Sequence, residues 1–323
     1  MGGKFADRWI TAIFSPAFAL WAVLSVAYFT ARGQPTVHQH GWLGAIRIWS
    51  RYLAGLPVVV QIALAIIPLL VLLVTGALIR LASLHIVRLL EGYWWPVLAV
   101  PRQFLRARLS RRCDRELGRL AELAARPVTD LSPEMLAERS RLERRRWRIP
   151  VDPRYRMPTR LGNGMRAAEL RPGLRYGLDS VVCWPRLWLL LPDASRQDIS
   201  GARASLYLSA QAWTCAVLAC AGAIWSWWAL PLGIAAAAAI YYWPVLGAAR
   251  AYCDLVGAAY DVHRRLLYDA LQWPYPANPA DERVQGTRLT LYLRVGSRDS
   301  EPAFQYREIA DASAGSRESR RTG

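Results

Sequence analysis

The residues best suited to bind a ligand lie in a mixed-charge stretch at the centre of the chain. The Gly-Asn-Gly sequence at 162–164 is typical of a tight turn, and such a turn can present backbone N–H groups to an anion. The spacing of a phosphate-binding loop is missing, so a structural turn beside Arg–carboxylate pairs is the favoured interpretation. The candidate interaction cluster consists of Asn163, Arg166, Glu169, Arg175, Asp179, Trp184 and Arg186.

Motifs for catalysis or metal binding are missing from the rest of the sequence. The signatures of zinc proteases, serine hydrolases and calcium loops do not occur. The five cysteines have neither paired nor His-containing spacing. Only His85, with Glu91 nearby, offers acid–base chemistry close to a predicted membrane edge. We therefore expect no catalytic residue, no metal ion and no cofactor.

His38 and His40 lie two positions apart in the segment before Trp42. Two imidazoles at this spacing suit a metal site or a pH sensor. No carboxylate or cysteine in the segment completes a metal site, so an ordinary polar loop is the favoured interpretation.

The apolar residues are gathered into three runs that contain no Asp, Glu, Lys, Arg or His. These runs are residues 10–31, 53–79 and 204–249. Charged side chains are costly in hydrocarbon, and about 20 helical residues cross a bilayer. The runs therefore predict a membrane protein. Their lack of charge also argues against proton relays, ion-coupled transport and voltage sensing.

The first two runs each fit one span, at 9–30 and 56–79. The third run is too long for one span, and the Trp-rich segment at 225–231, which ends in Pro231, divides it into spans at 204–225 and 230–249. The predicted fold class is therefore all-α: a four-span helical membrane protein with two transmembrane hairpins.

Basic residues near the span ends predict the orientation, because cytoplasmic flanks are rich in Arg and Lys. This rule places the N- and C-termini in the cytoplasm. The segments outside the spans are an extracytoplasmic loop at 31–55, an Arg-rich cytoplasmic helical domain with interfacial segments at 80–203, cytoplasmic amphipathic helices at 250–310 and a disordered tail at 311–323.

The Arg-rich domain is predicted to contain a pair of antiparallel helices. Apolar residues recur every three or four positions from Leu105 to Ala124, and arginines cover the remaining faces. Ser132 followed by Pro133 is a helix start signal. The arginines could meet anionic lipid headgroups or form a solvated basic face, and the sequence favours neither over the other.

The C-terminal part is ambiguous between helix and strand. Asn278-Pro279 with Asp281 and Glu282 is a helix start signal, whereas leucines alternate along 289–295 as in a strand. We favour a helix.

The pattern Pro-Thr-Arg-Leu-Gly-Asn, Arg-Ala-Ala-Glu, Arg-Tyr-Gly-Leu-Asp and Trp-Pro-Arg-Leu within 158–187 resembles an uncharacterised group of bacterial multi-pass membrane proteins. The likeness extends into residues 260–295 and covers about a quarter of the chain. It implies a multi-pass topology in the bacterial cytoplasmic (inner) membrane. It implies no activity and no catalytic residue.

The net charge of +17 would ordinarily point to nucleic acid. All but one of the 41 basic residues are arginine, which is typical of GC-rich coding, and they crowd beside the apolar runs, where membrane topology explains them. Nucleic acid is therefore not an expected partner. The expected partners are the lipid bilayer, anionic headgroups, and a protein partner or a second copy of the chain.

Three functions follow, in order of preference. The first is a non-catalytic integral membrane protein whose Arg-rich helical domain docks a protein partner or anionic lipid. The second is an oligomeric channel, because Pro68 lies within a span and small residues line the last two spans. The third is a membrane-interface enzyme that uses Glu169, Asp179, His85 or Arg175.

Overall fold

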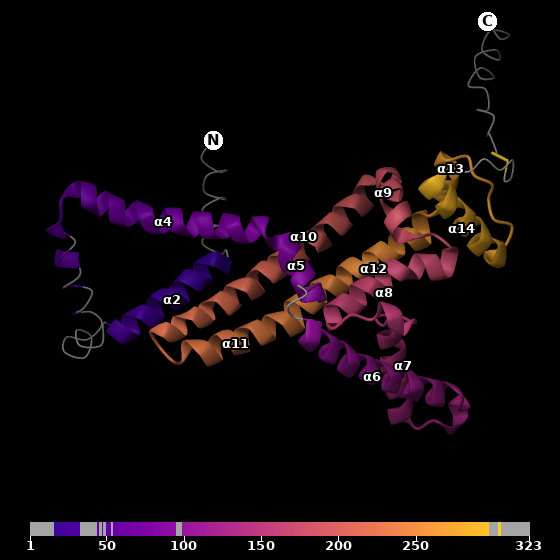
Figure 1. Ribbon diagram of the computed structural model, residues 1–323, viewed down its shortest axis with the longest axis horizontal. Helices are drawn as coiled ribbons and strands as arrows, with labels where there is room; N and C mark the ends of the chain where they lie inside the picture. Colours follow the sequence, from indigo (N-terminus) through magenta and orange to yellow (C-terminus); the bar gives the residue numbers. More distant parts are fainter. Residues whose placement is uncertain are drawn as a thin grey trace, which may run out of the picture. The chain divides into compact units, whose positions relative to one another are not determined.

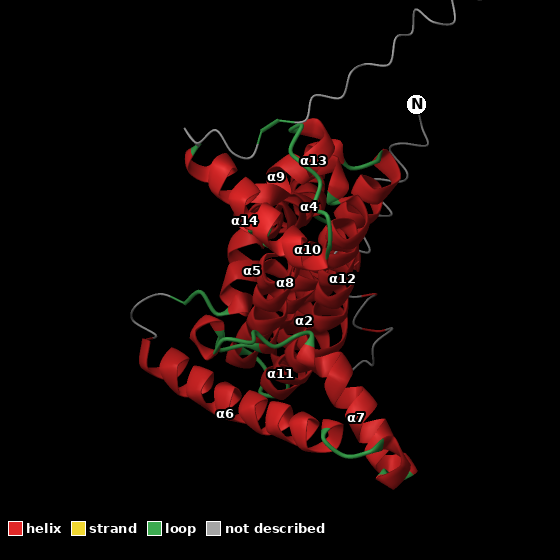
Figure 2. Cartoon of the chain, turned by 90° about the vertical axis from the view of Figure 1, so that its right-hand side faces the viewer, coloured by secondary structure: helices red, strands yellow, loops and turns green. Residues whose placement is uncertain are grey.

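The computed structural model describes residues 16–32, 54–94 and 99–296, together with residues 44, 47, 50–52, 303 and 304 (Figure 1). In this part of the chain all regular structure is helical and no strand occurs (Figure 2). The prediction of an all-α fold is confirmed for these residues. His38, His40, Trp42, the start of the first predicted span and the tail at 311–323 lie outside the described residues.

Three of the described helices are long and apolar enough to cross a membrane. They are α4 (Val58–Leu81), the helix Asp193–Ile224 and the helix Ala229–His263. The second comprises α10 (Asp193–Ala219) and η4 (Cys220–Ile224), and the third comprises α11 (Ala229–Ile240), the π-helix η5 (Tyr241–Val245) and α12 (Leu246–His263). The first predicted span is described only from Pro16, where the 17-residue helix α2 (Pro16–Arg32) begins.

The remaining helices connect and flank these segments. They are α5 (Ser83–Glu91), α6 (Ala99–Ala124), η2 (Val128–Asp130), α7 (Pro133–Arg146), η3 (Pro153–Tyr155), α8 (Arg160–Tyr176), α9 (Ser180–Leu190), α13 (Arg265–Ala270) and α14 (Pro279–Val295). Helix α14 includes the leucines that alternate like a strand, so the choice of helix there is confirmed.

Two of the predicted helix starts are formed by side-chain caps. The Ser132 hydroxyl accepts a hydrogen bond from the Met135 N–H at the start of α7, at 3.3 Å. The Asn278 side-chain oxygen accepts from the Ala280 and Asp281 N–H groups at the start of α14, at 3.0 and 2.9 Å. Both residues satisfy N–H groups that the helix itself leaves without partners.

The turn predicted at 162–164 is wrong, because these residues lie within α8. Neither Gly162 nor Gly164 has a positive φ. The Asn163 amide instead fixes the chain before the helix: its oxygen accepts from the Met157 N–H at 2.8 Å and its nitrogen donates to the Met157 carbonyl at 3.0 Å. This pair of bonds ties the first turn of α8 to the segment that precedes it.

The chain forms two compact units, each assembled from several stretches of the sequence. Unit 1 comprises Met1–Gln103, Thr159–Leu161 and Ala202–Ala251; unit 2 comprises Phe104–Pro158, Gly162–Gly201 and Tyr252–Gly323. The segment predicted as one cytoplasmic domain, 80–203, therefore contributes to both units. Helix α10 also begins at Asp193, well before the predicted start of its span at 204.

In unit 1, small residues bring α10 and α11 close together. A Cβ atom built on Gly233 would lie 2.6 Å from the Cys220 sulfur and 3.1 Å from the Ala216 carbonyl oxygen. Only glycine permits this approach, which is how membrane helices commonly associate. Leu20, Ile79, Cys215 and Ala219 form a buried cluster that joins α2, α4 and α10.

In unit 2, the core is built from α9, α12, α13 and α14 with the start of α10. The buried side chains include two tyrosines, Tyr260 and Tyr268, and three leucines, Leu187, Leu267 and Leu289. The cluster continues to Trp273, whose ring lies 5.2 Å from that of Tyr292. This core positions the C-terminal end of α12, the loop after α13 and the first turn of α14 relative to one another.

Candidate functional site

The seven residues of the predicted interaction cluster do not form a single site. Each lies in unit 2, but they occupy three separate environments on α8, on α9 and on the turn between these helices. The first environment is near the start of α8, where Asn163 binds the backbone of Met157 and Arg166 pairs with Glu169 at 2.8 Å. The Arg166 guanidinium also lies over the Tyr155 ring. The Arg–carboxylate pairing expected in this segment is therefore present within one helix.

The second environment joins the end of α8 to α12. Arg175 pairs with Asp261 at 3.1 Å, and the Tyr176 hydroxyl donates to the same carboxylate at 2.5 Å. The Arg264 guanidinium lies over the Tyr176 ring, 4.3 Å from its centre. Burial is the main cause that raises the pKa of Tyr176, and the hydrogen bond to the Asp261 carboxylate raises it further. The hydroxyl therefore remains a donor at neutral pH.

The third environment joins α9 to α14 and to the core. The Asp179 carboxylate accepts from the Val181 N–H at 2.9 Å, which caps α9, and it also pairs with Arg294 of α14. Arg186 donates to the Leu293 carbonyl at 3.4 Å. The Trp184 ring packs 5.7 Å from Tyr260 in the core. These three predicted residues therefore hold helices together.

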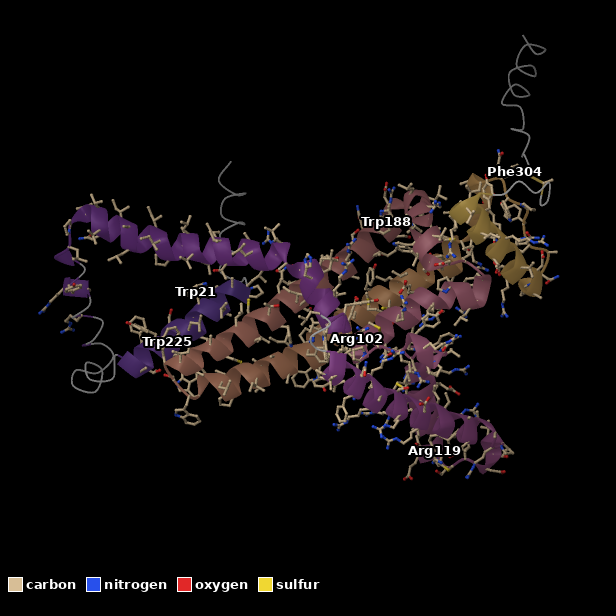
Figure 3. The ribbon with its side chains drawn as sticks, viewed as in Figure 1. Trp21, Arg102, Arg119, Trp188, Trp225 and Phe304 are labelled. Atoms are coloured by element: carbon tan, nitrogen blue, oxygen red, sulfur yellow. The ribbon has the colours of Figure 1, made fainter. Side chains whose placement is uncertain are left out.

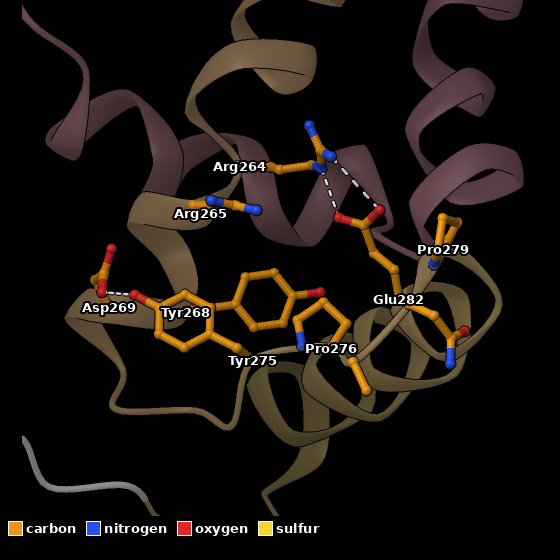
Figure 4. Close-up of a pocket in the computed structure, with 10 residues that line it drawn as sticks. Arg264, Arg265, Tyr268, Asp269, Tyr275, Pro276, Pro279 and Glu282 are labelled. Atoms are coloured by element: carbon orange, nitrogen blue, oxygen red, sulfur yellow. Dashed lines mark hydrogen bonds and ion pairs between the residues drawn. The ribbon is translucent and has the colours of Figure 1, made fainter.

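A pocket of about 610 Å³ lies between α13, the loop that follows it and the first turn of α14 (Figure 4). Its lining combines four charged side chains, two tyrosines and the loop that leads into α14. The lining residues are Arg264, Arg265, Tyr268, Asp269, Tyr275, Pro276, Ala277, Asn278, Pro279 and Glu282. None of the seven predicted cluster residues lines it. Its size falls within the range typical of small-molecule sites.

Two of the charged groups in the pocket neutralise each other. The Arg264 Nε lies 2.6 Å from a Glu282 carboxylate oxygen, and both side chains are largely buried. At the other end, Asp269 accepts a hydrogen bond from the Tyr275 hydroxyl. The rings of Tyr268 and Tyr275 stack with centroids 6.4 Å apart and form an aromatic wall.

Arg265 and Tyr268 differ from the other polar groups of the pocket. Arg265 is exposed and has no hydrogen bond or ion pair with any residue that the structure describes. The Tyr268 hydroxyl is buried and, over the same residues, has no hydrogen-bond partner. Burial raises the pKa of Tyr268, so the hydroxyl stays protonated and able to donate. Figure 4 shows the Arg265 guanidinium and the Tyr268 hydroxyl directed to the same side, toward Glu282.

A second candidate surface is one face of α6. Val100, Phe104, Arg108, Arg111 and Arg115 follow at helical spacing on that face. All five are exposed, and the apolar pair strongly so, at 78% for Val100 and 61% for Phe104. None of the three arginines has an acidic partner among the described residues. Figure 3 shows guanidinium nitrogens along α6 between the labelled Arg102 and Arg119.

The opposite face of α6 is buried and paired. Cys113, Leu120 and Leu123 are its buried residues. On this side Glu116 pairs with Arg145 at 2.9 Å. Arg119, four residues after Arg115 and so at the edge of the exposed face, pairs with Glu138 of α7 at 3.2 Å. Two ion pairs therefore link α6 to α7, in the order that antiparallel helices would have. Neither ion pair involves a residue of the exposed face that contains Phe104 and Arg108.

The pocket residues are not recognisable as a group in the sequence. Arg264, Arg265 and Asp269 lie in the segment predicted to form amphipathic helices at 250–310, and Glu282 belongs to the predicted helix start after Asn278. The i, i+3 spacing of Asp261 and Arg264, followed by the Pro-rich segment at 274–279, was the available signal. This spacing does not show that α14 supplies the other side of the pocket.

Comparison of the chain with protein-family models, with curated proteins and with solved structures found no match.

Proposed function

We propose that the chain is a non-catalytic integral membrane protein of the bacterial cytoplasmic membrane whose Arg-rich helix α6 docks on anionic lipid headgroups. In this proposal the chain crosses the bilayer four times, with α2 belonging to the first span and with both termini in the cytoplasm. The three long apolar helices support membrane insertion. The basic residues beside them support the orientation.

The observation that carries the docking proposal is the composition of the exposed face of α6. Two exposed apolar residues, Val100 and Phe104, precede three exposed arginines on the same face. Such a face suits a membrane surface, because the apolar residues enter the boundary of the hydrocarbon while arginines remain among headgroup phosphates. Each arginine close to an anionic surface contributes about 1 kcal/mol, so the three contribute about 3 kcal/mol.

The test uses the full chain in nanodiscs of phosphatidylcholine alone or with phosphatidylglycerol. Hydrogen exchange of the peptide that covers residues 104–118 measures contact with the lipid surface. We expect slower exchange in the anionic discs than in the neutral discs. Changing Arg108, Arg111 and Arg115 together to Gln should abolish that difference.

A matched control removes the same charge from another exposed site. Arg141, Arg144 and Arg146 of α7 are also exposed and have no acidic partner among the described residues. Changing these three residues to Gln should leave the lipid-dependent protection of α6 intact. Equal exchange in neutral and anionic discs would refute lipid docking and leave a protein partner as the expected ligand of the basic helices.

A further inference from the structure

We propose that the pocket between α13 and the start of α14 binds a small organic oxyanion, a carboxylate or a phosphate, through Arg265 and Tyr268. The proposal concerns a site separate from the α6 face and does not depend on lipid docking. It follows from the two polar groups that the protein leaves without partners.

The four charged lining side chains of the pocket sum to zero, and its unpartnered groups are the ones that favour an anion. Arg264 and Glu282 neutralise each other at 2.6 Å, and the Asp269 carboxylate accepts the Tyr275 hydroxyl. Arg265 is the ionised lining residue for which the described residues supply no partner. A carboxylate or phosphate satisfies guanidinium N–H groups with two parallel hydrogen bonds, which a cation cannot accept.

The Tyr268 hydroxyl supplies the second donor. A buried donor without a partner is costly, and few occur in a well-packed protein. An oxyanion is an acceptor, so one ligand satisfies both Arg265 and Tyr268. The hydroxyl is shielded from water, so a ligand reaches it only when the lining of the pocket shifts slightly. Residues 275–278 line the pocket before α14 begins at Pro279 and carry no helix or strand of their own.

The size and the apolar parts of the lining indicate an organic anion larger than a bare ion. The volume of about 610 Å³ exceeds what phosphate alone fills. The rings of Tyr268 and Tyr275 and the prolines offer an apolar surface for a carbon skeleton. The anion could be free in solution or be the headgroup of a lipid, because both present the same oxygens.

The test measures the thermal unfolding midpoint of the purified full chain in a non-ionic detergent. The soluble probes are glycerol 3-phosphate and glutarate, titrated at constant ionic strength against chloride. The lipid probe is dihexanoylphosphatidic acid, compared with dihexanoylphosphatidylcholine. We expect a saturable rise of the midpoint with at least one of the three anions. A response to phosphatidic acid alone would identify a lipid headgroup as the source.

Three variants then localise the response. Tyr268→Phe should raise the apparent dissociation constant about tenfold, the effect of losing one hydrogen bond to a charged group. Arg265→Gln should raise it by more than about tenfold, because it removes two charge-assisted hydrogen bonds. Arg288→Gln, at an exposed residue of α14 outside the pocket, should leave it unchanged. Without ligand, Tyr268→Phe should be as stable as the wild type or more so, because it removes an unpaired buried hydroxyl.

Three results would overturn the proposal. The first is the absence of a saturable response to all three anions. The second is an apparent dissociation constant that Arg265→Gln leaves within twofold of the wild-type value. The third is a loss of stability in ligand-free Tyr268→Phe, which would show that the hydroxyl already has a partner. Each result is independent of the exchange experiment on α6.

Discussion

Gly286 of α14 packs directly against the backbone carbonyl of Tyr176 at the end of α8. A Cβ atom built on Gly286 would lie 1.9 Å from the Tyr176 oxygen, well inside van der Waals contact. Gly177, the residue after Tyr176, is equally constrained. Its φ is +72°, and a Cβ there would lie 2.2 Å from the Arg283 carbonyl oxygen. The two glycines let α14 pack closely enough for Thr290 to donate to the Gly177 carbonyl at 3.0 Å. This contact also fixes the α14 wall of the pocket.

Gly286→Ala should strongly destabilise unit 2. The added methyl group meets backbone on the facing segment, which cannot rotate away as a side chain can, so α14 must separate from α8. We expect a loss of about 3 kcal/mol or more in the free energy of unfolding. Denaturant unfolding followed by tryptophan fluorescence measures it.

Gly164→Ala is the matched control for this substitution. Gly164 also lies within a helix, but a Cβ there meets nothing within 4 Å. Alanine should therefore stabilise α8 by about 0.5–1 kcal/mol, through its higher helix propensity. An equal loss of stability in both variants would contradict the close contact at Gly286.

Asp114→Ala should destabilise the α6–α7 region through a buried arginine. The Arg156 side chain is only 2% exposed, and its Nη1 lies 2.6 Å from an Asp114 carboxylate oxygen. It also donates to the backbone and hydroxyl oxygens of Ser110. Without Asp114, a buried guanidinium loses its counter-charge, so we expect a cost of about 2 kcal/mol. The cost is measured as a lower denaturant midpoint, together with faster tryptic cleavage between 104 and 158.

Arg154→Ala tests whether an exposed ion pair of the same type matters. Arg154 pairs with Asp152 at 2.8 Å, but its side chain is 86% exposed. Water and salt screen such a pair, so its loss should change the free energy of unfolding by less than about 1 kcal/mol. If Arg154→Ala were as destabilising as Asp114→Ala, burial of Arg156 would not be the cause of the larger effect.

Cys113 and Cys183 should react slowly with N-ethylmaleimide at pH 8 in the folded protein. Both thiols are buried, and burial raises the pKa of each above its ordinary value of 9.0; Arg156 at Cys113 and Thr290 at Cys183 oppose that rise only in part. A raised pKa lowers the thiolate fraction at pH 8, and the thiolate is the reactive form. Mass spectrometry of alkylated peptides, with the denatured chain as reference, measures the two rates.

The pH dependence of the same thiols has a defined sign. The folded protein favours the neutral thiol, so each buried thiol has a higher pKa in the folded than in the unfolded chain. Its contribution to the free energy of unfolding is fully present below pH 9 and is lost as the pH rises through the folded-state pKa. Alkylation of the folded protein should accelerate only above pH 9, whereas that of the denatured protein accelerates below it. Superimposable pH profiles for the two forms would contradict the burial of both thiols.

Much of the helical structure could be predicted because it depends on neighbours in the sequence. Long uncharged runs predict apolar helices, since unpaired charge is excluded from hydrocarbon whatever the tertiary fold. The caps at Ser132 and Asn278 were recognisable because a cap and the N–H groups that it binds are two or three residues apart. The leucines at 289–295 alternate as in a strand, but the helix start signal at Asn278 correctly predicted a helix there.

The tertiary structure decided what the polar residues do. Residues 162–164 have the composition of a turn, yet they lie within α8, and the Asn163 amide binds the backbone of Met157 before that helix. Arg175 meets Asp261 across 86 positions, and Asp179 meets Arg294 across 115. The pocket depends on Gly286 and on the core at Tyr268, which bring α14 against α12 and α13. Charge and hydropathy along a chain determine which segments avoid water, but they do not specify which distant side chains meet. That choice depends on close packing between helices.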